Sequence, residues 1–132
     1  MKPVIILVTF VAASAVAATA STQATSARNP QTVPIVEVIG CVSEGPNSTW
    51  LLTNGTEPAV SKAPNTTTAA VKEAERKRLG RRNYELLGVT PFGPENHKGR
   101  RVVVKGVLIK AAKNDRINVT SLQITATPCG AK

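Results

Sequence analysis

The stretch Arg101-Val102-Val103-Val104-Lys105-Gly106-Val107-Leu108-Ile109 is rich in aliphatic, mostly β-branched residues. Residues of this type favour extended strands. In an extended chain, successive side chains point to opposite faces, and here both faces are apolar. A strand with two apolar faces must be covered on both sides. We therefore expect residues 101–109 to form the central strand of a β-sheet.

Four more segments have the composition of short strands, with β-branched, aliphatic or aromatic residues bounded by turn residues. They are residues 33–42, 49–53, 84–89 and 116–124. Within the first of them, Gly40 predicts a bulge or a sharp bend. The second ends at Asn54-Gly55, a pair that strongly indicates a hairpin turn. The chain thus contains five expected strands.

The last of these segments changes phase along its length. Ile117 and Val119 have one parity, whereas Leu122 and Ile124 have the other. Because side chains alternate between two faces of a strand, this switch requires one extra residue. It predicts a β-bulge near residues 120–121.

A long insertion, residues 56–83, separates the second and third expected strands. Its first part, residues 56–68, holds two prolines and three consecutive threonines, so we expect a loop there. Residues 69–79 have high helix propensity and precede Gly80, which is a natural helix stop. This helix has few large apolar residues, so we expect it to be weakly anchored on the surface or helical only part of the time.

Five strands, with an insertion after the second and an irregular connection over residues 90–99, fit a mainly β fold. The OB-fold, a small five-stranded barrel, has this element order. A twisted antiparallel sheet or a small sandwich is the alternative. We expect one OB-like β-barrel domain over residues 33–130, with a helical or disordered basic insertion.

The amino-terminal segment has the composition of an export signal. Lys2 precedes an apolar run from Val4 to Val11, and small residues follow as far as Ala20. This run is shorter than the roughly 20 apolar residues that span a bilayer. We expect a signal peptide over residues 1–20, with an uncleaved membrane anchor as the alternative.

Cleavage is expected after Ala18-Thr19-Ala20, with Ala15-Val16-Ala17 as a competing site. Residues 21–32 are polar and small without periodicity, so they predict a flexible linker. No later segment is long and apolar enough to be a transmembrane segment. We expect the processed protein to be exported, either to the periplasm or out of the cell.

Two cysteines remain after processing, Cys41 and Cys129. An even number of cysteines in an exported chain indicates a disulfide, since that compartment permits oxidation. Two free thiols are the alternative. A zinc site is not expected, because two distant cysteines and one histidine do not supply its ligands.

The chain carries a formal net charge of +9, from 17 Lys and Arg against 8 Asp and Glu. The excess lies between residues 62 and 116, in the insertion and around the later turns. A basic surface attracts polyanions, although charge also serves solubility alone. The candidate anion-binding residues are Arg76, Lys77, Arg78, Arg81, Arg82, Lys98, Arg100 and Arg101. Three further basic residues flank the last expected turn, namely Lys110, Lys113 and Arg116.

Signals for catalysis and for nucleic-acid recognition are weak. His97 is the only histidine, and no serine has the context of an activated nucleophile. We expect no catalytic residues and no cofactor. Single-strand binders stack bases on aromatic side chains, but this chain offers only Trp50, Tyr84 and Phe92 after processing. Nucleic acid is therefore not the expected natural partner.

Several short blocks resemble small exported bacterial OB-fold proteins, that is, the bacterial OB-fold (BOF) domain family and its secreted relatives. These blocks are residues 38–42, 50–54, 84–86, 97–106 and 117–122. The resemblance implies a periplasmic or secreted β-barrel and supplies no catalytic residues. The chain differs from that family by its long basic insertion, where such proteins have a tight hairpin.

Two functions fit these observations. The first is a non-enzymatic binding module that takes an anionic ligand or an envelope partner through the basic insertion and the loop rim. The second is a structural or envelope-stress protein whose partner is another protein, with incidental positive charge. A nucleic-acid binder or a small hydrolase is less well supported.

Overall fold

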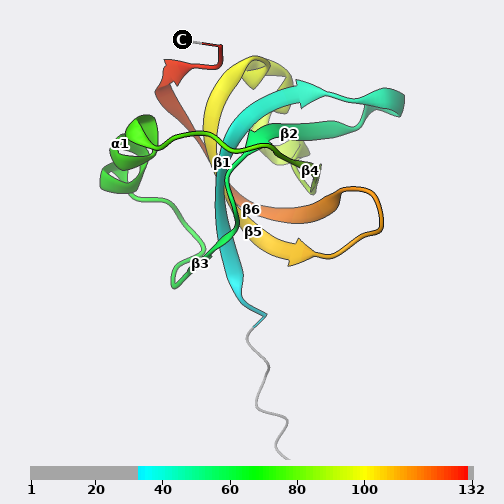
Figure 1. Ribbon diagram of the computed structural model, residues 1–132, viewed down its shortest axis with the longest axis horizontal. Coiled ribbons are helices and arrows are strands. Elements are labelled where there is room, and N and C mark those ends of the chain that lie inside the picture. Colours follow the sequence, from blue (N-terminus) through cyan, green and yellow to red (C-terminus); the bar gives the residue numbers. More distant parts are fainter. Residues whose placement is uncertain (1–32, 131–132) are drawn as a thin grey trace, which may run out of the picture. The chain divides into compact units, whose positions relative to one another are not determined.

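The computed structural model describes residues 33–130 (Figure 1). The expected signal peptide, residues 1–20, and the expected linker, residues 21–32, lie outside the described residues. The strands are β1 (Ile35–Glu44), β2 (Trp50–Gly55), β3 (Ala59–Ser61), β4 (Arg82–Leu87), β5 (Arg100–Ile109) and β6 (Asp115–Pro128). The helix α1 spans Thr68–Arg76, and short 3₁₀ turns lie at Pro46–Ser48, Thr90–Phe92 and Pro94–His97.

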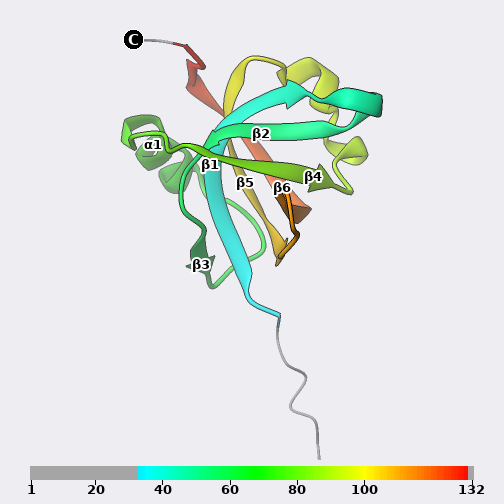
Figure 2. The same cartoon turned by 45° about the vertical axis from the view of Figure 1, so that its right-hand side comes forward.

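The strands form one six-stranded sheet that closes in a ring (Figures 1 and 2). Their order is β2-β4-β6-β5-β1-β3, and β1 also pairs with β2. The pairing of β4 with β6 is parallel, whereas the other pairings are antiparallel. The prediction that residues 101–109 form a central strand is confirmed, because β5 lies between β1 and β6.

The prediction of a loop over residues 56–68 is wrong in part, because β3 lies within this segment and adds one strand to the five that were expected. β3 pairs with Ile35–Glu37, the first residues of β1. On this side, β1 pairs with β2 only from Cys41 onward, so its first half would otherwise expose unpaired backbone groups. Three residues that follow a proline give too short a pattern to indicate a strand in the sequence.

Buried side chains form two clusters on opposite faces of the central strand. The larger cluster draws on β1, β2, β4, β5 and β6, and it includes Val102, Val104 and the fully buried Tyr84. The smaller one joins Ile39 and Val103 to Ala74 of α1. Both faces of β5 are therefore covered, as its sequence indicates.

The β-bulge expected near residues 120–121 is confirmed. Lys105 lies opposite Ser121, but the next residue of β5, Gly106, lies opposite Val119. Thr120 thus has no partner in the pairing of β5 with β6, and its hydroxyl donates a hydrogen bond to the Lys105 carbonyl at 3.2 Å. The extra residue reverses which face the following side chains occupy.

Of the two alternatives expected at Gly40, a bulge or a sharp bend, the bulge does not form in the pairing of β1 with β5. Residues 35–41 stay in register with β5 through this position, and β1 is one long curved strand (Figure 1). Glycine is needed here for space: a Cβ atom would lie 2.7 Å from Leu52 Cγ and 2.9 Å from the Thr53 carbonyl oxygen.

The hairpin turn expected at Asn54-Gly55 is also absent. Asn54 has a φ of 52°, and the pairing of β2 with β4 shifts register between Leu52 and Gly55.

The expected disulfide between Cys41 and Cys129 is present, with a Cα–Cα distance of 5.9 Å. It ties the middle of β1 to the residue that follows β6, across 88 positions of the sequence. The Cys129 amide also donates to the Gly99 carbonyl at 3.1 Å. The carboxyl-terminal end of the described chain is thereby fixed to both β1 and the start of β5.

Replacing both cysteines by alanine should lower the free energy of unfolding by about 2–5 kcal/mol, because the unfolded chain loses the constraint of a long closed loop. Urea unfolding followed by the fluorescence of Trp50 would measure the change. Equal stability of the double variant and the oxidised protein would contradict a stabilising bridge.

Candidate functional site

A polar cleft lies where the end of the insertion meets the turn before β6. Its volume is about 330 Å³, and its lining residues are Arg81, Arg82, Asn83, Lys113, Asn114 and Asp115. The parallel pairing of β4 with β6 sets Tyr84 opposite Asp115, so the residues that precede both strands lie side by side. We call this the basic cleft.

Gly80 fixes the chain just before the basic cleft. Its amide donates a hydrogen bond to the Asn54 carbonyl at 3.1 Å. A Cβ atom at this position would lie 2.3 Å from the Gly55 carbonyl oxygen, so only glycine permits this close approach. The backbone just before Arg81 is therefore held against the end of β2.

Charge in the basic cleft is partly compensated. Arg82 pairs with Glu57 at 2.7 Å and lies 3.7 Å from Asp115. A hydrogen bond and the charge of Glu57 raise the pKa of Arg82 above its ordinary value. Among residues 33–130, Arg81 and Lys113 form no ion pair. Two cations, Arg81 and Lys113, thus remain available to a ligand.

Asp115 shapes the turn rather than repelling an anion. Its carboxylate accepts hydrogen bonds from Lys110 Nζ at 2.9 Å and from the Ala111 amide at 3.2 Å. These two hydrogen bonds, together with the charges of Lys110 and Arg82, lower the pKa of Asp115 below its ordinary value. The carboxylate is therefore charged at neutral pH, and its charge is neutralised locally.

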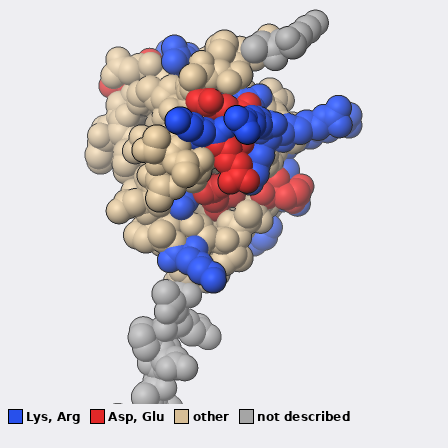
Figure 3. All heavy atoms as spheres, turned by 90° about the vertical axis from the view of Figure 1, so that its left-hand side faces the viewer, with Lys and Arg blue, Asp and Glu red and all other residues tan. Residues whose placement is uncertain are grey.

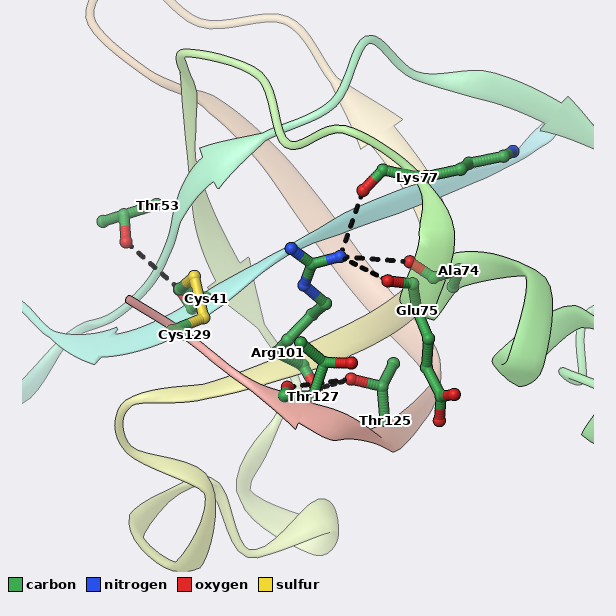
Figure 4. Close-up of a disulfide and its surroundings, with 9 residues drawn as sticks. All are labelled: Cys41, Thr53, Ala74, Glu75, Lys77, Arg101, Thr125, Thr127 and Cys129. Carbon is green, nitrogen blue, oxygen red and sulfur yellow. Dashed lines mark hydrogen bonds between the residues drawn. A yellow bond between two sulfur atoms is a disulfide. The ribbon is translucent and has the colours of Figure 1, made fainter. Parts of the chain in front are cut away.

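Arg101, one of the candidate anion-binding residues, holds the end of α1 instead. Its Nη1 donates to the carbonyl oxygens of Ala74, Glu75 and Lys77, at 3.4, 3.1 and 3.0 Å (Figure 4). Ala74 and Glu75 belong to the last turn of α1 and Lys77 is its C-cap, where carbonyl groups lack the full set of helical partners. The Ala74 carbonyl also accepts a hydrogen bond from the Lys77 amide at 3.3 Å. A second tie runs from the Ala126 amide to the Glu75 carboxylate, at 2.8 Å.

The helix expected over residues 69–79 is present as α1, but α1 ends at Arg76, three residues earlier than expected. Lys77 is already extended, with φ −71° and ψ 140°. Leu79 packs on the smaller core cluster, and Gly80 must reach the end of β2. Tertiary contacts therefore stop the helix before its sequence propensity runs out.

The remaining candidate residues are spread over other parts of the molecule. Arg76, Lys77 and Arg78 are exposed at and beyond the end of α1. On the face that carries α1, acidic side chains lie between the basic ones (Figure 3). Arg100 is exposed at the start of β5, while Lys98 pairs with Glu44 and lies over the Trp50 ring at 5.5 Å from its centroid.

The structure therefore brings Arg81 and Arg82 together with Lys113, but it does not bring all eight candidates to one place. Asn83, Asn114 and Asp115 also line the cleft and were not singled out in the sequence. They follow from the parallel pairing of β4 with β6, which no local pattern indicates.

His97 has a local structural contact. Its Nε2 donates a hydrogen bond to the Phe92 carbonyl at 3.0 Å, which links the two 3₁₀ turns before β5. A ring fixed to its own connection in this way contributes to the shape of that connection. No described contact of His97 involves a nucleophile.

Arg101→Gln should lower the free energy of unfolding by about 1–3 kcal/mol, because the helix-end carbonyls lose their donor. Arg100→Gln is the matched control: it removes the same charge from an exposed neighbour and should change stability by less than about 0.5 kcal/mol. Urea unfolding measures both values, and the rate of tryptic cleavage after residues 76–78 reports on α1. Equal effects of the two substitutions would show that the contact with α1 is not stabilising.

The lowered pKa of Asp115 predicts a pH dependence. The carboxylate stabilises the fold at a pH above its unfolded pKa, near 3.8, and this contribution is lost as the pH falls through the lower folded value. The stability difference between the wild type and Asp115→Asn should therefore be full at pH 7 and shrink below roughly pH 5. Chemical unfolding at several pH values checks it, and a constant difference down to pH 2 would contradict it.

Comparison with protein-family models, curated proteins and solved structures found no match to this chain. Within residues 33–130, no three His, Cys, Asp or Glu residues are grouped so that they could hold a metal ion. In the same residues, no helix has both the length and the apolar character needed to cross a membrane.

Proposed function

We propose that this chain is an exported, non-enzymatic binding module that takes an anionic ligand at the basic cleft. The observation that carries the proposal is the presence of two cations, Arg81 and Lys113, that form no ion pair within residues 33–130 and line one open cleft. Two carboxamides, Asn83 and Asn114, add neutral hydrogen-bond donors. Phosphate, sulfate and carboxylate groups are the chemical classes that such donors bind.

The order of the strands supports an OB-like barrel as the scaffold. Without β3, which belongs to the insertion, the ring consists of five strands in the order β1-β2-β4-β6-β5. An OB-fold is a five-stranded Greek-key barrel, and the loop before its last strand borders the usual ligand face. Residues 110–114 occupy that position in the chain and contribute Lys113 to the basic cleft. The short blocks that resemble the bacterial OB-fold (BOF) domain family agree with this scaffold.

Export is supported by two independent features. The amino-terminal sequence has the composition of a cleavable signal, with Lys2 before the apolar run from Val4 to Val11. The disulfide between Cys41 and Cys129 is stable in an oxidising compartment. A periplasmic or secreted protein would meet acidic glycans, anionic lipids and other polyanions there.

The aromatic side chains do not favour nucleic acid as the natural partner. Tyr84 is fully buried, and burial raises the pKa of its hydroxyl, which donates to the Thr56 carbonyl at 2.8 Å. Trp50 and Phe92 pack against the larger core cluster. Base stacking needs exposed ring faces, so these three side chains supply a poor platform for it.

The distribution of charge favours a second candidate function, a protein-interaction domain with incidental positive charge. Arg82, Lys98 and Arg101 are engaged with carboxylates or carbonyls within the fold. On the face that carries α1, acidic side chains interrupt the basic ones (Figure 3). A partner with charges of both signs would suit that face better than a polyanion.

The two candidates differ in what the cleft residues contribute. The double variant Arg81→Gln/Lys113→Gln should weaken binding to heparin, lipopolysaccharide or single-stranded DNA roughly tenfold or more, since charge-assisted hydrogen bonds each contribute about 1.5–3 kcal/mol. The matched control Lys62→Gln/Lys72→Gln removes the same charge away from the cleft and should weaken binding far less. Titrations at two salt concentrations measure both.

Two outcomes would count against the anion-binding cleft. Absence of binding to all three probes at low salt would remove the proposal and leave the protein-interaction domain. Equal weakening by both double variants would mean that net charge, rather than the cleft, attracts the polyanion.

A further inference from the structure

A second open pocket, of about 400 Å³, lies beside the disulfide and is separate from the basic cleft. Cys41 and Cys129 both line it, together with small or short residues that include Ser43, Gly99 and Gly130. The lining also includes Glu44 and Lys98, which form an ion pair, and the open pocket leaves room for a small molecule to approach the two cysteines. We call this the disulfide pocket.

The two cysteines of the bridge differ in exposure. Cys41 lies within β1 and is only 6% exposed, whereas Cys129 follows the end of β6 and is half-buried. Cys129 is therefore the more exposed residue of the bridge. Thiol–disulfide exchange proceeds by attack of a thiolate on one sulfur, while the other sulfur leaves as a thiolate. The exposure difference selects Cys129 as the attacked sulfur and Cys41 as the leaving one.

The residue paired with Cys41 across the sheet is a cation. Arg101 is the residue directly opposite Cys41 in the antiparallel pairing of β1 with β5, so the two side chains project from the same face of the sheet. Figure 4 shows Arg101 in the surroundings of the bridge, with its guanidinium directed to the carbonyls of Ala74, Glu75 and Lys77. Its Nη1 holds the end of α1, but its Nε is buried and has no hydrogen-bond partner among the described residues.

A buried donor without a partner is costly in a folded protein and calls for a physical explanation. A thiolate on Cys41 would place a negative charge on the same face of the sheet as this guanidinium. Nearby guanidinium groups lower the pKa of a thiol, and a thiol of lower pKa leaves faster in exchange. The position of Arg101 thus favours cleavage of the bridge in the direction that frees Cys41.

We propose that the disulfide pocket is a thiol-exchange site whose substrate is a small thiol or the thiolate of a reductase. The incoming thiolate forms a new sulfur–sulfur bond with Cys129 as the Cys41–Cys129 bond breaks, and the electron pair stays on Cys41 as a thiolate opposite Arg101. A second thiolate then attacks the mixed disulfide at the external sulfur and releases Cys129 as a thiolate. The external thiols are oxidised to their disulfide, and the bridge is reduced.

Exchange at this site would change the end of the chain most directly. With the bridge open, the residue after β6 keeps its amide bond to Gly99 but loses its covalent tie to β1. The proposal does not require an anion in the basic cleft, because the two sites share no lining residue.

The test uses the oxidised full chain and reduced glutathione as the probe, under native conditions. Samples are quenched in acid at intervals, alkylated and mapped by peptide mass spectrometry. Glutathione should appear on Cys129 and the alkyl label on Cys41, with at least about tenfold preference over the reverse pattern, because access and the leaving group both select it. Equal labelling, glutathione mainly on Cys41, or exchange only in denaturing urea would overturn the proposal.

A pair of variants tests the role of Arg101 as a positioning residue. Arg101→Gln removes the cation opposite Cys41 and should slow the exchange several-fold, whereas Arg100→Gln removes a neighbouring charge and should leave the rate unchanged. If Arg101→Gln acted only by loosening the fold, exchange would become faster rather than slower. Faster exchange, or equal rates in the two variants, would contradict stabilisation of the leaving thiolate by Arg101.

Discussion

The whole arrangement depends on β1 pairing with three other strands. Its first residues pair with β3 on one side and β5 on the other, while Cys41–Glu44 pair with β2. A strand used in this way must be long, must change partners along one edge, and must let β2 approach closely at Gly40. Because β1 joins both ends of the ring, the insertion, the disulfide and the carboxyl-terminal end of β6 are all positioned relative to it.

Two cations fasten the insertion to this ring by binding backbone carbonyls. Lys105 is buried, donates to the Asn65 carbonyl at 2.9 Å, and has Glu37 at 3.6 Å as its counter-charge. Arg101 holds the end of α1 in the same manner. A buried cation needs such partners, since removing one partner leaves an uncompensated charge. Part of the positive charge of this chain is therefore structural, and net charge alone overstates its capacity for anions.

The features that could be predicted from the sequence are those carried by local patterns. The two apolar faces of β5 and the phase change at Thr120 are visible in the alternation of side chains. The bridge of Cys41 with Cys129 was expected from the even number of cysteines together with the expected export signal, and it is present. The short β3 and the early end of α1 could not be predicted, because tertiary contacts determine both.

The same distinction applies to the candidate site. Arg81 and Arg82 were among the expected residues, but their closeness to Asn114 and Asp115 depends on a parallel pairing between segments about 30 residues apart in the chain. Arg101 was among the candidate anion-binding residues and instead contacts the helix end. The composition shows which charged side chains the chain contains, whereas the ion pairs and hydrogen bonds of the fold show which of them are free to bind a ligand.

The basic cleft and the disulfide pocket lie at opposite ends of β6. Asp115 begins this strand beside the cleft, and Pro128 ends it just before Cys129. Its 14 residues span about 45 Å along the strand at roughly 3.3 Å per residue. The two sites are also connected through Arg101, the end of α1 and the chain that leads to Arg81. In this connection Gly80 is hydrogen-bonded to the end of β2, so a movement of α1 would stop before it reaches Arg81. Opening the bridge should therefore release the end of β6 while the cleft keeps its geometry, so the proposed anion binding and the proposed thiol exchange would be separable.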